Sequence, residues 1–144
     1  MDNFQKKTIY LNSSKYKTIV DEIVDLKLFS SNVDLFVFAA GIGFSENISE
    51  PIGQGQRGTE IKTDSTDALK NNLGAIRAIA LADKQDVSIL DDLDECSEIF
   101  AGYVNGGLAR LEEIRQENPK DIDFIDEILQ LLKRQATKNR KSKS

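Results

Sequence analysis

The side chains that most often perform chemistry are scarce in this sequence of 144 residues. It contains no histidine and one cysteine, Cys96, beside 24 acidic and 19 basic residues. Without histidine there is no Ser/His or Cys/His nucleophile pair and no imidazole metal ligand. A single cysteine excludes an internal disulfide and a paired-cysteine zinc or redox site. We therefore predict no catalytic residue, no metal site and no cofactor, and we expect a protein that is not an enzyme.

Carboxylates are the remaining candidates for chemistry, and the densest group runs from Asp91 to Glu95. Mg²⁺ and Ca²⁺ prefer carboxylate oxygens, but this run lacks the glycine and the distal glutamate of a calcium-binding loop. Negative charge also suits the positive end of a helix dipole, so we interpret the run as a helix start. Cys96 falls on the inward face of that helix, where a thiol packs as a small hydrophobic group.

The segment Gly53-Gln54-Gly55-Gln56-Arg57-Gly58 has the spacing G-x-G-x-x-G. A dinucleotide-binding loop with this spacing follows a strand and opens a helix. Here Glu50-Pro51 precedes the glycines and Thr59-Glu60-Ile61 follows them, which fits neither requirement. We predict a flexible surface loop at 53–58, because glycine tolerates many backbone conformations.

The charges divide the chain into an acidic body and a basic end. Residues 1–132 hold all the acidic residues and have a net charge of −11, whereas residues 133–144 have a net charge of +6. The basic residues of the end are Lys133, Arg134, Lys138, Arg140, Lys141 and Lys143. We predict a helical domain at 1–132 and a basic disordered tail at 133–144. The tail either keeps the protein soluble or contacts DNA or RNA phosphates without sequence preference.

The hydrophobic pattern predicts an all-α fold, a single compact bundle of about five helices. Apolar residues at three- and four-residue steps predict helices near 16–28, 73–84, 93–114 and 119–132. Residues 33–44 are apolar all round and are predicted as the central, fully covered helix. Residues 59–62 could add a short β-strand. Ser14 and Asn118 are the predicted N-caps of the first and last helices.

Two details of the predicted helices bear on function. Gly106 and Gly107 interrupt the fourth helix and either kink it or let another segment pack tightly there. In the fifth helix we predict that the buried stripe consists of Ile122, Ile125, Ile128 or Leu129, and Leu132.

The longest apolar run, Val33 to Phe44, is too short to span a membrane, and no signal-peptide pattern follows the N-terminus. We expect a cytoplasmic protein.

Three segments taken together resemble one known family. They are 34–44 (DLFVFAAGIGF), 78–90 (AIALA with DVSIL) and 99–108 (IFAGYVNGGL). This series is similar to the DNA phosphorothioation-associated protein 4 family, small accessory proteins encoded beside systems that replace a DNA backbone oxygen with sulfur and restrict unmarked DNA. The family tends to have glutamate where this chain has Gly102. It has no established catalytic residues, so the resemblance implies a pathway and not a reaction.

The resemblance implies a non-enzymatic accessory or adaptor protein of a DNA modification–restriction (antiviral defence) system, acting by contact with other proteins of that system. In this reading Asn105, Gly106 and Gly107 form a close-packing surface for the partner, or else they pack within the domain. The alternative is a DNA-binding or regulatory protein that uses the basic C-terminal residues. A third possibility is an enzyme that relies on carboxylates and a divalent metal, although no pair of acids stands out.

Overall fold

The computed structural model describes residues 8–53, 55–58, 60–62 and 67–143. Its elements are β1 (Thr8–Tyr10), η1 (Ser14–Tyr16), α1 (Lys17–Asp25), α2 (Asn32–Glu46), β2 (Glu60–Lys62), α3 (Asp67–Lys84), η2 (Val87–Asp91), α4 (Leu93–Glu117) and α5 (Asp121–Lys143), where η denotes a 3-10 helix. β1 and β2 pair antiparallel as a two-stranded ribbon. The described residues therefore confirm the all-α fold, and β2 overlaps the short strand considered at 59–62.

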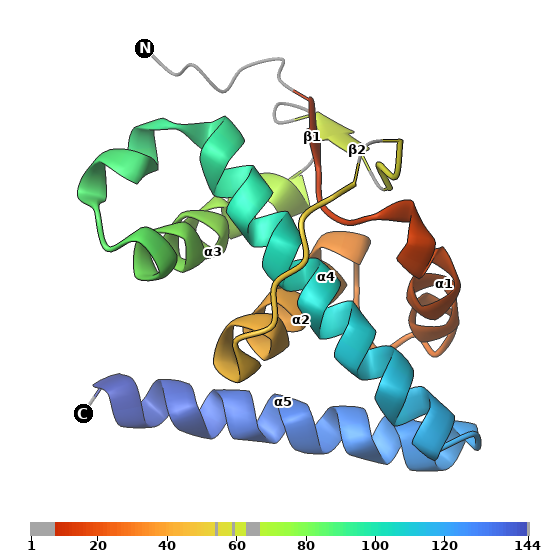
Figure 1. Ribbon diagram of the computed structural model, residues 1–144. Coiled ribbons are helices and arrows are strands. Elements are labelled where there is room, and N and C mark those ends of the chain that lie inside the picture. The colour runs from red at the N-terminus through yellow and green to blue at the C-terminus, as the bar shows by residue number, and fades with distance from the viewer. Residues whose placement is uncertain (1–7, 54, 59, 63–66, 144) are drawn as a thin grey trace.

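Helices α2 and α4 form the centre of the molecule (Figure 1). The hydroxyl of Ser31 caps α2 by accepting a hydrogen bond from the backbone N–H of Asp34 at 3.2 Å. Other elements of the fold cover most sides of α2, and its own side chains are accordingly apolar on most of its faces. Leu35 and Phe36 are fully buried. This confirms the predicted central helix, but the helix is not covered throughout, because Phe44 has 40% of its surface exposed. Neither of its glycines ends it, since α2 continues to Glu46.

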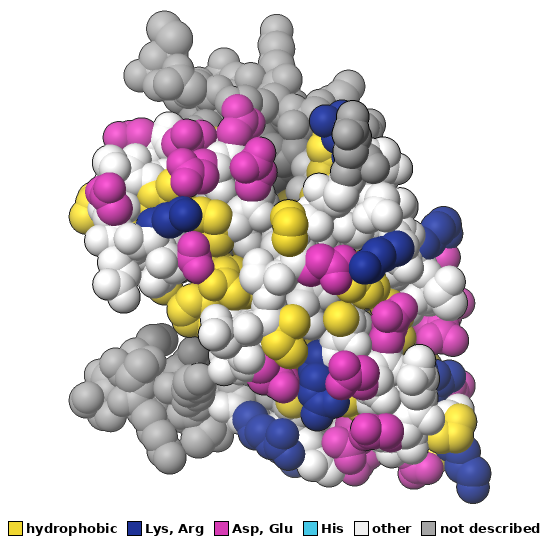
Figure 2. Space-filling view, viewed as in Figure 1, with side chains coloured by type: hydrophobic (Ala, Val, Ile, Leu, Met, Phe, Trp, Pro, Cys, Tyr) yellow, Lys and Arg dark blue, Asp and Glu magenta, His cyan; other side chains and the backbone are white. Residues whose placement is uncertain are grey.

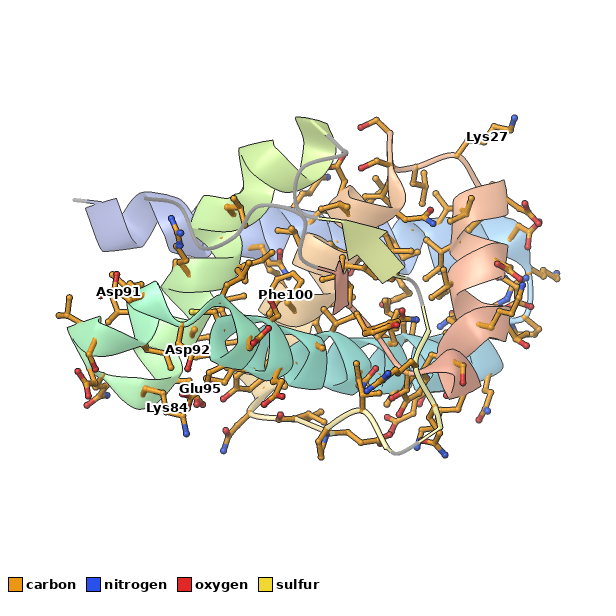
Figure 3. The ribbon with its side chains drawn as sticks, turned by 90° about the horizontal axis from the view of Figure 1, so that it is seen from above. Lys27, Lys84, Asp91, Asp92, Glu95 and Phe100 are labelled. Atoms are coloured by element: carbon orange, nitrogen blue, oxygen red, sulfur yellow. The ribbon has the colours of Figure 1, made fainter. Side chains whose placement is uncertain are left out.

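The three- and four-residue steps that predicted a helix near 93–114 mark its inward face. The residues at these steps are all buried: Leu93, Cys96, Phe100, Tyr103, Gly107, Leu111 and Ile114. In Figure 1 this helix crosses the middle of the molecule, with α3 on one side and α1 on the other. Figure 3 shows the Phe100 side chain between the helices, as its full burial requires.

Several predicted helix ends are wrong. Ser14 lies inside η1 and caps nothing, because a 3-10 turn precedes α1. Helix α3 begins at Asp67, six residues before the predicted start at Leu73. Asn118 closes α4 instead of opening α5: its side-chain amide donates to the carbonyl oxygen of Ile114 at 2.9 Å. Asparagine occurs at both ends of helices, so the sequence alone does not assign Asn118 to one of them.

The basic end of the chain continues α5 as far as Lys143. The disordered tail at 133–144 stays a prediction. Lysine, arginine, glutamine and alanine are good helix formers, and positive charge is favourable near a helix C-terminus. A segment with almost no apolar residues can therefore extend a helix that is anchored elsewhere. The anchor is in the first half of α5, where Phe124 and Ile128 are fully buried. The boundary of the folded domain at Leu132 stays a prediction.

Candidate functional surfaces

The predicted partner-binding segment lies in the interior of the domain. Asn105 is fully buried, and its side chain ties together three distant parts of the chain. Its amide oxygen accepts a hydrogen bond from the backbone N–H of Ser13 at 2.8 Å. Its amide nitrogen donates to the hydroxyl of Ser13 at 3.0 Å and to the carbonyl oxygen of Glu50 at 2.7 Å. Asn105 thus fixes the N-terminal segment and the loop after α2 against α4.

The two glycines beside Asn105 allow other parts of the backbone to pack closely against α4. A Cβ on Gly106 would lie 1.9 Å from the carbonyl oxygen of Ile48, and a Cβ on Gly107 would lie 1.8 Å from that of Ala39. Only glycine permits backbone contacts this close. Of the two readings of this segment, the geometry favours packing within the domain and does not support a surface for a partner.

Glu50 is a polar junction that the sequence analysis missed. One carboxylate oxygen lies 2.6 Å from the ammonium group of Lys15, and the other accepts a hydrogen bond from the Tyr16 hydroxyl at 2.9 Å. Burial, followed by the hydrogen bond to Glu50, raises the pKa of Tyr16 to about 12. The phenol is therefore protonated at neutral pH and acts as a donor. No spacing in the sequence links residue 50 to residues 15 and 16.

A second tyrosine–carboxylate pair joins α4 to the end of α3. The Tyr103 hydroxyl donates to a carboxylate oxygen of Asp83 at 2.5 Å. This hydrogen bond, followed by burial, raises the pKa of Tyr103 to about 12. The ring of Phe44 meets the Tyr103 ring edge-on, with centroids 5.4 Å apart. Like the contacts of Glu50, this pair holds helices together and leaves no deprotonated phenol available at neutral pH.

The acidic run at 91–95 starts a helix, as predicted. The Asp92 carboxylate accepts a hydrogen bond from the backbone N–H of Glu95 at 3.1 Å and so caps α4. Figure 3 places Asp91, Asp92 and Glu95 at the same end of the molecule. Within the described residues, no three or more histidine, cysteine, aspartate or glutamate side chains are grouped so that they could hold a metal ion.

Cys96 is buried on the inward face of α4, in agreement with the prediction. Its thiol donates to the carbonyl oxygen of Ile89 at 3.1 Å. Burial raises the pKa of Cys96 from its ordinary value. Thiol groups react as thiolates, so this environment gives the sulfur a packing role between η2 and α4 and disfavours nucleophilic chemistry.

The glycine-rich segment is a loop, as predicted, in its described residues. β2 follows it instead of a helix, and the described residues between α2 and the loop form no strand. The backbone N–H of Gly58 donates to the carbonyl oxygen of Asn12 at 2.9 Å, and Gly55 has a φ of +75°. The glycines thus allow a close approach to the N-terminal segment. This context is not that of a dinucleotide-binding turn.

The basic residues predicted to contact DNA lie along the last half of α5. Lys133 and Arg134 are exposed on this helix. The side chains of Lys138, Arg140, Lys141 and Lys143 lie outside the described residues. The structure therefore places two of the six predicted nucleic-acid contacts on the surface of one regular helix.

Helix α5 departs most from its predicted burial pattern. Ile122, predicted to be buried, has 75% of its surface exposed, and Leu129 has 44% exposed. Ile128, one of the two residues predicted for that turn, is fully buried, and so is Phe124, which the predicted stripe did not include. The helix has turned its Phe124 face towards the core, because the ring fills more volume there and stacks under the guanidinium of Arg115, 5.0 Å from the ring centroid.

Acidic side chains gather on the lobe formed by the end of α3, η2 and the start of α4 (Figure 2). Exposed members of this lobe are Asp83, Asp86, Asp91, Asp92 and Asp94. Val87 lies among them in η2 with 70% of its surface exposed. We call these residues the acidic lobe. It combines negative charge with an exposed aliphatic side chain, a combination that suits contact with a basic protein surface.

The fold and these surfaces define a small helical protein whose buried polar side chains join its elements. Residues 14–144 match the family model of DNA sulphur modification system-associated protein 4, and the chain belongs to this family. The family resemblance of the sequence is thereby confirmed. No curated protein and no solved structure matches the chain. None of the described helices is both long enough and apolar enough to cross a membrane.

Proposed function

We propose that this chain is a non-enzymatic accessory or adaptor protein that docks on a larger protein of a DNA sulphur modification and restriction system. The observation that carries the proposal is the family match over residues 14–144. The chemistry of the interior supports it. Asn105, Glu50 and Cys96 each bond to a backbone group or side chain of a neighbouring element.

The acidic lobe is the docking surface in this proposal. Its carboxylates repel DNA phosphates and attract basic protein surfaces, which also speeds association. The exposed Val87 contributes an apolar contact beside these charges. Asp92 and Asp86 cap α4 and η2, and Asp83 accepts the hydrogen bond of Tyr103, so we vary Val87 and Asp91.

Affinity capture from a host that carries the modification system tests the proposal. The tagged wild-type chain is expected to recover other proteins of the system. A Val87→Ser/Asp91→Lys variant is expected to recover several-fold less of them, because it removes the apolar contact and reverses a charge. The matched control is Val24→Ser/Asp25→Lys at the end of α1, where both residues are also exposed.

Two results would contradict this function. The wild-type chain recovered repeatedly without any component of the system would reject the adaptor role. Equal losses in the acidic-lobe variant and the α1 control would reject the lobe as the docking surface. Circular dichroism of each variant establishes that the fold is retained.

DNA binding through α5 is a second candidate function. It is supported by the continuation of α5 to Lys143, which sets six basic residues and no acidic one along the last turns of a single helix. Such binding would be sequence-blind and would weaken steeply with salt. A gel-shift salt titration compares the full chain with one that ends at Leu132. Equal binding by the two chains, or no binding by the full chain at low salt, rejects this function.

A further inference from the structure

Helix α5 has two apolar faces, and the core covers one of them. The inward face contains the buried Phe124 and Ile128. A second stripe follows steps of three and four residues and consists of Ile122, Ile125, Leu129, Leu132 and Ala136. A helix on the surface of a globular domain normally needs a single apolar face. The alternation of three- and four-residue steps is the pattern of a seam between two helices of a coiled coil.

The second stripe is accessible. Ile122, Leu129 and Ala136 are exposed, Ile125 is partly exposed, and Leu132, at the edge of the stripe, is partly buried against the core. In Figure 1, α5 lies along one border of the molecule with the other labelled elements on one side of it. A second helix could therefore approach without displacing the body of the domain.

The charges along α5 indicate which helix fits. The first two turns hold Asp121, Asp123, Asp126 and Glu127 and no basic residue. The last turns, from Lys133 onwards, hold six basic residues and no acidic one. A second α5 in antiparallel orientation brings each acidic half against a basic half. A parallel orientation brings like charges together.

We infer that two copies of this chain associate through α5, packed antiparallel along the stripe of Ile125, Leu129, Leu132 and Ala136. Such a two-fold arrangement is closed and self-complementary. It goes beyond the adaptor function and does not depend on it. Its consequence is a dimer that presents two acidic lobes.

One register satisfies both the apolar and the charged residues. When Leu129 lies opposite Leu132 of the second copy, Ile125 lies opposite Ala136 of that copy. At a rise of about 1.5 Å per residue, Asp126 then lies about 3 Å along the axis from Lys133 of the second copy. The two-fold axis repeats each contact. Asp126 and Lys133 both flank the stripe, since they follow Ile125 and Leu132 in the sequence.

The helix dipole does not account for the whole pattern. Acidic residues at the N-terminus and basic residues at the C-terminus also stabilise a lone helix. The dipole, however, gives no reason for exposed isoleucine and leucine at coiled-coil spacing. The apolar stripe and the charge order are separate features, and antiparallel self-association uses both.

A charge-exchange cycle at Asp126 and Lys133 tests the inference. The two residues are seven positions apart, about 10.5 Å along one helix, so they do not contact each other within a chain. Sedimentation equilibrium is measured for the wild type, Asp126→Lys, Lys133→Asp and the double variant. We expect each single variant to weaken dimerisation about tenfold or more, because it opposes like charges across the interface. The double variant is expected to recover most of the wild-type affinity.

Leu129→Gln supplies the apolar test, and Val24→Gln is its control. Both replace an exposed aliphatic side chain, but only Leu129 lies on the stripe. We expect Leu129→Gln to weaken the dimer at least tenfold and Val24→Gln to leave it unchanged.

Three outcomes would overturn the inference. A wild type that is monomeric at several hundred micromolar rejects self-association. A dimer that Leu129→Gln and the single charge variants leave intact uses another surface. A monomeric wild type whose capture of other proteins is lost in Leu129→Gln assigns the stripe to a different partner. Melting curves of the variants show that each is folded. If only the acidic-lobe variant loses capture of other proteins, the dimer inference is unaffected.

Discussion

At the scale of single residues, polar side chains connect separate elements of this protein by hydrogen bonds. Asn105 illustrates the principle, because a fully buried amide is costly unless its donors and acceptor are satisfied. Its hydrogen bonds pair the backbone N–H and hydroxyl of Ser13 and the backbone carbonyl of Glu50, as well as the donors and acceptor of the amide itself. Removing one side chain therefore leaves several buried groups without partners.

We expect Asn105→Ala to lower the free energy of unfolding by about 3 kcal/mol, since a buried unsatisfied group costs about 1–3 kcal/mol. Urea unfolding followed by circular dichroism measures the change. Asn32→Ala is the matched control, because Asn32 is exposed at the start of α2 and should change stability by less than about 0.5 kcal/mol. A cost below about 1 kcal/mol at Asn105 would contradict the role of this network.

The raised pKa of Tyr16 predicts a loss of stability at alkaline pH. The pKa is about 12 in the folded chain and 10.0 is the ordinary value. A group whose pKa is raised on folding stabilises the fold below the unfolded value, and this contribution disappears as the pH rises through the folded value. Stability should therefore decline between about pH 10 and pH 12. Tyr103 contributes in the same range, because its pKa is also about 12.

Tyr16→Phe should remove one phenolate signal near pH 12 from the ultraviolet titration and make the alkaline loss of stability shallower. Tyr103→Phe is the comparison, and the double variant should show the smallest decline. Ionisation of Tyr16 near pH 10 in the folded protein would contradict its contact with Glu50.

At the scale of elements, the closeness of α2 and α4 is decided by glycine. Gly43 in α2 meets the carbonyl group of Tyr103 in α4, and Gly107 in α4 meets that of Ala39 in α2. Each helix thus carries a glycine where the other helix's backbone passes. These contacts explain why glycines persist inside two helices despite a cost of about 1 kcal/mol each.

Gly107→Ala and Gly74→Ala should change stability in opposite directions. At Gly107 the new Cβ would lie 1.8 Å from a backbone oxygen, so the helices must separate, at a cost of about 3 kcal/mol. At Gly74 in α3 a Cβ meets nothing within 4 Å, so alanine should stabilise the helix by about 0.5–1 kcal/mol. Urea unfolding measures both, and similar changes at the two positions would contradict the packing argument.

At the scale of the whole molecule, α5 is attached by its first half. Phe124 and Ile128 are fully buried, whereas Lys133, Arg134 and Ala136 are exposed. The amide nitrogen of Gln135 lies 3.4 Å from the carbonyl oxygen of Phe38, a weak contact in the last part of the helix with described side chains. The folded body therefore depends little on residues beyond Leu132.

A chain that ends at Leu132 should keep its fold and lose less than about 1 kcal/mol of stability. Phe124→Ala in the full chain should cost about 3–5 kcal/mol, because it empties a filled site in the core. Thermal melting compares the two. A larger loss from the truncation than from Phe124→Ala would place the domain boundary beyond Leu132.

The family and most of the helices could be predicted from the sequence because both depend on local pattern. The apolar stripe of α4 from Leu93 to Ile114 repeats at a helical period. The run at 33–44 is apolar on all its faces, and such a helix is stable only at the centre of the fold. Helix ends were less predictable. Asn118 fits either end of a helix, and the tertiary arrangement assigned it to the end of α4.

What the sequence by itself determined is the class of fold, the central helix and the lack of histidine chemistry, since these follow from residue types and their periodicity. Only the tertiary structure decided the roles of particular residues. Burial of Asn105 and Gly106 depends on the loop at Ile48 and Glu50 reaching α4 across more than 50 residues, and no local pattern encodes that approach. The face of α5 that turns inwards was likewise set by competition between two apolar stripes, because the available cavity accommodated Phe124 and left Ile122 and Leu129 outside.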